Sequence, residues 1–420
     1  MPSLSVLDEE TVNEINANFS VITSTLDDLS EGLTFADFVT SYIFISKNIE
    51  NTLNYLQDGI VSLTAQADKL EKIFTSSPLQ VSFYRAHPQT IFVYRDAIRK
   101  FSDMIRAIVN NLYSNVSTTL AAYIFVYETL EKFKLKTPFI LIESNDFIAN
   151  DLNNFIFSIF DKLGEKPKYR ESNAQVITYS GIDIKNPLSL LIMGHETFHV
   201  IDKQLKVFES FCKATGFTSS NCCEDAFIDI MSFIYFGPAY TYAVQNHFQK
   251  RYPLSGNSHL EMNIRMSILE TLISTLNSSR KSEEKISGFI KTLEGRMDEA
   301  SKAKAKGDKQ LLDKMMDKDA VGFITNFFKS MGIAPYNEFT ENIEKRDVQR
   351  KTEYIDRKKI IYMLKNDIPV AVRPVTLLNT LCETGYIDKI DSGLFVSSLK
   401  KWYVWRYYEK SKERQGTPDC

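Results

Sequence analysis

The sequence predicts an α+β protein that is predominantly helical, with one short region of strand pattern between long helical stretches. Within residues 1–133, apolar side chains recur at intervals of three and four, as at Val12, Ile15 and Phe19. Two short runs rich in β-branched residues follow, at 136–143 and 174–180, and such runs are typical of strands. Helical periodicity then resumes for most of the remaining chain.

Bulk properties limit the classes of function. A chain of 420 residues exceeds one typical domain, and its 44% hydrophobic content is enough for a packed core. The formal net charge of −3 argues against a nucleic acid as the main partner, because a phosphate-binding surface normally shows as basic excess. The five cysteines form an odd set that suits a reducing compartment. With no signal-like N-terminus and no apolar run of membrane-spanning length, we expect a soluble, cytoplasmic protein with no membrane span.

Changes in composition divide the chain into four expected regions. The N-terminal helices form an antiparallel bundle or coiled-coil-like arm, or alternatively a platform that binds a protein partner. A charged stretch rich in Lys and Glu is expected to be an exposed helical hairpin with its turn near Gly307. The regions are an N-terminal helical region at 1–133, a core at 134–278, the charged hairpin at 279–318 and a mostly helical C-terminal region at 319–420 that packs on the core.

Residues that start or break helices, such as Asn, Pro and Gly, set the expected limits of the core helices and strands. A helical pattern from about Asp146 to Leu163 separates the two strand candidates. Asn186-Pro187 is expected to open a strong helix, because Asn is a good N-cap and Pro is tolerated in the first turn. A later helical stretch is expected to break at Phe236-Gly237-Pro238.

The strongest chemical signal is the pattern H-E-x-x-H, formed by His195, Glu196 and His199. On a helix, residues four apart lie about 40° apart around the axis and about 6 Å along it, so both imidazoles can converge on one ion. Glu196 can face a metal-bound water without being a ligand. Because the flanking residues are mostly apolar, the helix is expected to be buried, and buried histidines need partners that a metal supplies.

A catalytic zinc needs a third protein ligand and one open position. The segment 221–231 offers Glu224, Asp225 and Asp229. Here the sequence resembles the gluzincin metallopeptidases, in which a second helix carries E-x-x-x-D: the first acid binds zinc and the second orients a ligand histidine. The resemblance implies Asp225 as ligand and Asp229 behind a histidine, although Asp replaces the usual Glu. Glu224 stays an alternative, as do the thiols of Cys222 and Cys223.

Two further segments extend the resemblance. Tyr235 to Tyr240 is similar to the Gly-Pro-Ala-aromatic turn of several soluble HExxH protein groups. Ser258 to Arg265 is similar to the T-H-P-x-x-x-x-R element of HtpX-like and CAAX-prenyl-type proteases, with Leu260 in place of Pro. The resemblance implies His259 as a donor to the oxyanion and Arg265 as a structural or substrate-carboxylate partner. Tyr240 is a candidate donor to a tetrahedral intermediate. The alternatives are ordinary surface and packing roles.

The resemblance covers roughly Ala174 to Leu269, less than a quarter of the chain, and implies a zincin-like core with a small sheet and two metal-bearing helices. In that family the strand before the zinc helix is an edge strand that pairs with an extended peptide substrate. A plain structural strand at 174–180 is the alternative.

These residues lead to a specific expectation of function. One Zn²⁺ per chain, held by His195, His199 and Asp225 or Glu224, activates water for attack on a peptide bond of a peptide or protein substrate, with Glu196 as the general base. A non-catalytic binding protein with a closed zinc site, which Cys223 completes, is the main alternative. A third is a peptidase of a defence or stress system that is autoinhibited in its free form.

Overall fold

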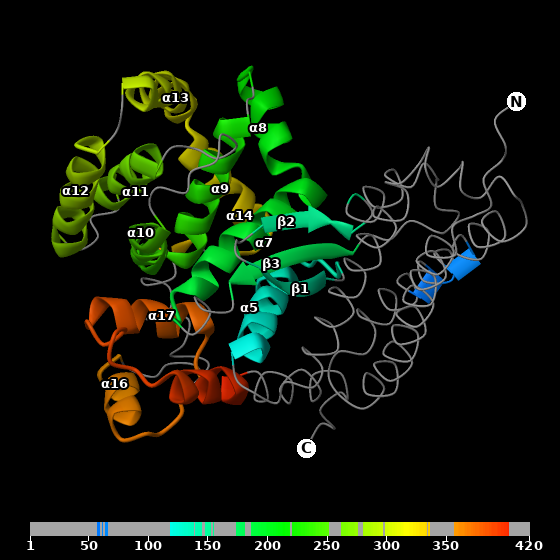
Figure 1. Ribbon diagram of the computed structural model, residues 1–420, viewed down its shortest axis with the longest axis vertical. Helices are drawn as coiled ribbons and strands as arrows, with labels where there is room; N and C mark the ends of the chain where they lie inside the picture. Colours follow the sequence, from blue (N-terminus) through cyan, green and yellow to red (C-terminus); the bar gives the residue numbers. More distant parts are fainter. Residues whose placement is uncertain are drawn as a thin grey trace, which may run out of the picture. The chain divides into compact units, whose positions relative to one another are not determined.

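The computed structural model describes residues 57–58, 61, 64–65, 118–137, 139–144, 148–152, 154, 174–180, 186–218, 221–251, 262–275, 280–296, 299–333, 335–336 and 357–402 (Figure 1). The chain divides into two compact units, one of residues 1–115 and 136–178 and the other of residues 116–135 and 179–420. The predicted N-terminal helical region lies largely outside the described residues. The described part is predominantly helical with one small sheet, as the sequence predicts.

The sheet has three strands in the order β1-β3-β2. The strands are β1 (Phe139–Ser144), β2 (Ile148–Asp151) and β3 (Gln175–Ser180). β2 runs antiparallel to β3, with Ile148 opposite Thr178 and Asp151 opposite Gln175. The division between the units falls inside β3, after Thr178.

Two expectations about this region are wrong. Ile148–Asp151 is a strand and not the start of a helix, because pairing with β3 outweighs a local pattern that suits either structure. β3 also lies between β1 and β2, so neither of its edges is free for an extended peptide, and it is a structural strand.

The second unit is built from helices. Their bounds are α5 (Thr118–Lys132), α7 (Ser189–Leu205), α8 (Val207–Thr215), α9 (Asn221–Phe236), α10 (Pro238–Arg251), α11 (Met262–Thr275), α12 (Arg280–Glu294), α13 (Glu299–Asp317), α14 (Ala320–Ser330), α16 (Arg357–Lys365) and α17 (Pro374–Glu383). Helix α7 packs against α5, α9 and α10, and α9 packs in turn against α11 and α14. Within the described residues, no helix is both long and apolar enough to cross a bilayer.

Helix α7 begins three residues later than Asn186. The side chain of Asn186 accepts a hydrogen bond from the backbone N–H of Leu188 at 3.0 Å, and its carbonyl accepts one from Ser189 at 2.9 Å. Asn186 therefore closes the turn that leads into the helix, instead of capping the helix itself.

An aromatic cluster holds α5, α7, α9 and α14 together. Phe198 of α7 lies 5.5 Å, centroid to centroid, from Phe133 and from Phe236, with both ring pairs edge to face. Phe328 of α14 closes the cluster 5.4 Å from Phe133. Each such aromatic pair adds about 0.5–1.5 kcal/mol beyond the area that it buries. The cluster thereby fixes α7 relative to α9.

Gly194 lets α7 and α9 approach closely. A Cβ on Gly194 would lie 2.4 Å from Cζ of Phe236 and 3.1 Å from Cε1 of Phe125, so any side chain here would push the two rings away. Phe125 and Phe236 stack on each other at 5.4 Å. The glycine immediately before His195 therefore brings α9 close to the H-E-x-x-H turn.

The predicted break between α9 and α10 is confirmed. Gly237 has φ +74°, a conformation that costs glycine little, and Pro238 occupies the first position of α10. Asn379 of α17 holds both sides of the break: its Nδ2 donates to the carbonyl of Phe236 at 2.6 Å, and its Oδ1 accepts from the N–H of Ala239 at 3.0 Å. This side chain satisfies backbone groups that the break leaves without helical partners.

The charged region 279–318 contains two helices, but the predicted turn is in the wrong place. Gly307 lies inside α13, whereas α12 ends at Glu294. α12 packs mainly along α11 through a buried stripe, and α13 contacts α9, α11 and α14. Lys, Glu and Asp side chains lie on the exposed faces of both helices. The stripe on α12 consists of Ile286, Phe289, Ile290 and Leu293.

Within residues 319–402, the C-terminal helices pack on the helical unit through α14 against α9 and α17 against α10. Trp402 is 3% exposed, and its indole N–H donates to Glu128 at 3.3 Å. This tryptophan is a packing residue in the structure.

The close contact at Gly194 leads to a stability prediction. Gly194→Ala is expected to lower the free energy of unfolding by about 1–3 kcal/mol, because the added methyl overlaps Phe236. Gly307→Ala is the matched control: it lies in exposed helix with open space around it and should stabilise by about 0.5–1 kcal/mol. Urea unfolding of both variants tests this, and equal effects of the two substitutions would contradict the packing argument.

Candidate metal centre

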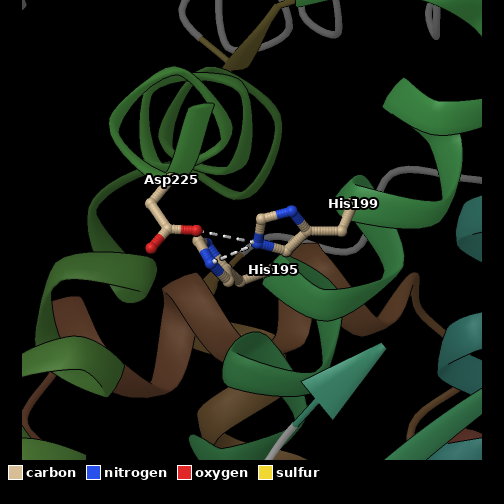
Figure 2. A group of neighbouring side chains, drawn as sticks. All are labelled: His195, His199 and Asp225. Atoms are coloured by element: carbon tan, nitrogen blue, oxygen red, sulfur yellow. Dashed lines mark hydrogen bonds and ion pairs between the residues drawn. The ribbon is translucent and has the colours of Figure 1, made fainter. Parts of the chain in front are cut away.

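Helix α7 presents His195 and His199 on one face, one turn apart (Figure 2). Their Nε2 atoms are 3.2 Å apart, and the two ring planes are close to perpendicular, at 84°. Two nitrogen ligands of a tetrahedral zinc ion, each ~2.0–2.1 Å from it, lie about 3.3 Å from each other. The two imidazoles therefore already have the spacing that a shared zinc ion requires.

Asp225 of α9 supplies a third donor atom. Its Oδ1 lies 3.4 Å from Nε2 of His199, again close to the edge length of a zinc tetrahedron. The ligand atoms of His195, His199 and Asp225 all lie within 4.8 Å of one another (Figure 2). The first turn of α9 thus faces the histidine pair of α7, and both helices contribute to one group.

Glu224 lies on the opposite side of the same imidazole. Its Oε1 is 3.9 Å from Nδ1 of His199, and its side chain is 45% exposed, whereas that of Asp225 is 15% exposed. The sequence left both acids open as the third ligand. The geometry favours Asp225 on the Nε2 side as ligand and Glu224 on the Nδ1 side as the carboxylate that orients His199.

The cysteine alternative gains nothing from the structure. Cys223 is buried in α9 and is not part of the three-residue group. The side chain of Cys222 lies outside the described residues.

Behind His195, a buried ion pair closes the other side of the site. Asp229, with no exposed surface, lies 3.1 Å from Nδ1 of His195 through Oδ1. Arg265 of α11 binds both carboxylate oxygens, from Nε to Oδ2 at 2.7 Å and from Nη2 to Oδ1 at 2.6 Å. The hydroxyl of Tyr240 donates to Oδ1 at 2.5 Å and lies 2.9 Å from Nδ1 of His195. Helices α7, α9, α10 and α11 thus meet at one carboxylate.

The charges in this network stabilise one another. Burial on its own would raise the pKa of Asp229, but Arg265 and His195 outweigh it and hold that pKa far below the usual range. Burial acts to lower the pKa of Arg265, and Asp229 more than reverses this. Burial, and then the charge of Asp229, raise the pKa of Tyr240 well above 10. Asp229 is thus ionised and Tyr240 protonated at any physiological pH.

The pKa of His199 is raised, whereas burial alone lowers the pKa of a histidine. Burial acts to lower its pKa, but the carboxylates of Glu224, Glu196 and Asp225 together raise the pKa to about 9. Without metal, His199 is therefore protonated at neutral pH and can donate toward Nε2 of His195. Because a metal must displace this proton, affinity for the metal should increase as the pH rises toward about 9.

Glu196 follows His195 on α7 and is half-buried. Its negative charge contributes to the raised pKa of His199, which places the carboxylate within electrostatic reach of the ligand face. A general base for a metal-bound water would have to lie near this same face.

The structure thus brings together most of the residues that the sequence suggested: His195, His199, Asp225 and Glu224 around the group, and Asp229, Tyr240 and Arg265 behind it. Tyr240 is fully buried on the Nδ1 side of His195, which favours a structural role over the expected donation to an intermediate. His259 lies outside the described residues, so its role stays a prediction.

Sequence reasoning missed the two-bond pairing of Arg265 with Asp229. A signal was present: Arg265 stands alone between Ile264 and Met266 in a helix whose neighbours are mostly apolar, which indicates a buried cation with a buried partner. What the sequence does not reveal is which acid it pairs with, because the two residues are 36 positions apart on different helices.

In comparisons with known proteins, no family model matches the chain, and no curated protein or solved structure matches it. The geometry of the site therefore carries the functional argument.

The third ligand can be identified by metal titration. Asp225→Ala and His199→Ala are each expected to weaken Zn²⁺ binding by more than the ~10–100-fold that loss of an orienting partner costs. Glu224→Gln is the matched control, since it removes the neighbouring carboxylate charge from the Nδ1 side of His199. Its loss of Zn²⁺ affinity should stay within ~10–100-fold. Competition titration with a chelating dye measures all three, and a larger loss in Glu224→Gln than in Asp225→Ala would reverse the assignment.

The buried ion pair leads to a second prediction for this region. Arg265→Met should lower the free energy of unfolding of the metal-free protein by about 3–5 kcal/mol, because it leaves the Asp229 charge buried without its main partner. Lys291→Met, on the exposed face of α12, is expected to change it by less than ~0.5 kcal/mol. Both are measured by urea unfolding in EDTA, and a loss below ~1 kcal/mol in Arg265→Met would show that Asp229 does not depend on the guanidinium.

Proposed function

We propose that this chain is a zinc-dependent peptidase. The single observation that carries the proposal is the convergence of His195, His199 and Asp225 from two helices, with 3.2 Å between the two Nε2 atoms and 3.4 Å from Nε2 of His199 to Oδ1 of Asp225. Three protein donors are the number that a catalytic zinc takes, since its fourth position receives water or substrate. The resemblance of the motifs to the gluzincin metallopeptidases supports the same reaction class.

A zinc ion at this site would make bound water acidic and polarise the carbonyl of a peptide substrate. The chain's own residues do the rest. Glu196 takes the proton from the attacking water and returns it to the leaving amine. Asp229 and Glu224 each face the Nδ1 of a ligand histidine and orient it. His259 as a donor to the developing oxyanion stays part of the proposal that only the sequence supports.

The alternative is a non-catalytic protein that uses zinc for stability and binds a partner. Such a site would need a fourth protein ligand, because structural zinc is almost always bound by four. Within the described residues the group has three members, which favours the enzyme. A peptidase that is autoinhibited in its free form differs from both, since it would bind zinc through three ligands yet cleave only after activation.

The proposal is tested by separating metal binding from hydrolysis. Glu196→Gln is expected to retain one Zn²⁺ per chain and to lose cleavage of a peptide library by ~10²–10⁴-fold, because it removes only the base. Glu209→Gln, an exposed acid on α8, serves as the control and should cleave like the parent. Mass spectrometry of the library before and after EDTA gives the readout.

Undiminished cleavage in the Glu196→Gln variant would remove Glu196 from the reaction. A zinc-loaded parent that cleaves no peptide would favour the binding protein or the autoinhibited enzyme. Limited proteolysis of the parent, followed by the same assay, separates these two cases, since only the autoinhibited enzyme gains activity.

A further inference from the structure

The contacts of His195 differ sharply between its two ring nitrogens. Nδ1 faces oxygen atoms, with the hydroxyl of Tyr240 at 2.9 Å and the carboxylate of Asp229 at 3.1 Å. Nε2 faces two nitrogen atoms, Nε2 of His199 at 3.2 Å and Nη2 of Arg265 at 3.5 Å, and the guanidinium nitrogen of Arg265 can only donate. The surroundings of Nδ1 therefore favour a hydrogen-bond donor at that nitrogen, and the surroundings of Nε2 favour an acceptor.

The direction of the Tyr240 hydroxyl follows from its partners. A phenol has one proton, and the ionised Asp229 is the stronger acceptor, so Tyr240 donates to Oδ1 over 2.5 Å. The phenol oxygen then has only lone pairs to offer to His195. Because the Asp229 carboxylate also only accepts, every oxygen that contacts Nδ1 is an acceptor.

It follows that the neutral His195 carries its proton on Nδ1. The opposite tautomer would aim the Nδ1 lone pair at two oxygen acceptors in a fully buried space, which leaves a buried hydrogen bond unmade. With the proton on Nδ1, the Nε2 lone pair points into the space between His195, His199 and Asp225. Arg265 supports this arrangement, because a guanidinium is a donor only and it approaches the Nε2 side.

The side chain of Tyr240 is completely buried, and its ring lies nearly parallel to that of His195, at 9° with a centroid separation of 6.2 Å. The ring of Phe236 also packs near it, at 6.4 Å between centroids. The phenol is therefore held against the Nδ1 edge of the imidazole, away from the face where a substrate would meet the metal.

We propose that Tyr240 is a positioning residue of the metal site: together with Asp229 it fixes His195 in the Nδ1–H tautomer, so that the Nε2 lone pair is always available to the metal. This inference rests on the metal site of the proposed function and does not depend on peptidase activity. It also extends the support of the ligand histidine from one carboxylate to a relay that runs from Arg265 through Asp229 and Tyr240 to His195.

The test compares Tyr240→Phe with Tyr242→Phe, two tyrosines of the same helix that each lose one hydroxyl. Tyr242 lies near Lys285 and serves as the control. Titration of each full-length variant with Co²⁺ is expected to give about tenfold weaker binding and an altered visible spectrum for Tyr240→Phe, within the ~10–100-fold typical of an orienting partner. Tyr242→Phe should match the parent. An unchanged affinity and spectrum in Tyr240→Phe would overturn the proposal.

A second measurement is independent of both metal and hydrolysis. Long-range ¹H–¹⁵N NMR of the metal-free protein with ¹⁵N-labelled histidine, in mildly alkaline buffer, reports which nitrogen of His195 is protonated, and a His195→Gln variant assigns the signal. We expect the Nδ1–H form in the parent and a measurable share of the Nε2–H form in Tyr240→Phe. A dominant Nε2–H form in the parent would overturn the inference.

These readouts also distinguish its failure from that of the proposed function. A parent that binds Co²⁺ and shows the Nδ1–H tautomer, yet hydrolyses nothing, would leave the Tyr240 role intact and reject the peptidase. A parent that cleaves peptides, combined with a Tyr240→Phe variant that binds metal with parental affinity, would support the peptidase and reject the Tyr240 role.

Discussion

The helical unit depends on one buried carboxylate. Asp229 has no exposed surface and receives donors from three other helices: Arg265 from α11, Tyr240 from α10 and His195 from α7. A buried ion is tolerated only when its partners compensate for the water that it has lost. Because those partners come from different helices, satisfying this single charge also fixes how the helices meet, and the ligand face of α7 is one result.

The same packing explains how two helices can contribute to one candidate metal group. The aromatic cluster around Phe198 holds α7 against α9, and Gly194 lets them approach at the turn that carries His195. The approach brings Asp225 within 3.4 Å of His199, although Asp is one methylene shorter than the Glu of the families that the sequence resembles. The shorter acid and the close helix contact are thus parts of one arrangement, and Oε1 of Glu224 lies 3.9 Å from Nδ1 on the other side of the His199 ring.

How much of this was predictable differs between local and distant relationships. The helix around His195 and His199, the break at Gly237 and the strand candidates follow from spacing and turn residues alone. Whether Asp225 or Glu224 faces Nε2 of His199 depends on the rotation of α9 about its axis. The local sequence of α9 does not determine this rotation. The strand at 148–151 was missed because four residues carry too little periodicity, and only pairing with β3 decides their conformation. The central place of β3 in its sheet was likewise beyond local reasoning.

The junction between α9 and α10 depends on a residue that is synthesised much later. Asn379 holds the backbone at Phe236 and Ala239 from 143 and 140 residues further along the chain. During synthesis at the roughly 5–20 residues per second typical of translation, α7 and α9 leave the ribosome well before this side chain does. The histidine face therefore spends its first seconds next to a helix junction without its polar partners, and contacts of such long sequence separation are the slow ones to form. The junction between α9 and α10 is therefore completed only after α17 has been synthesised and has docked, which makes the local structure at this break depend on the C-terminal part of the chain.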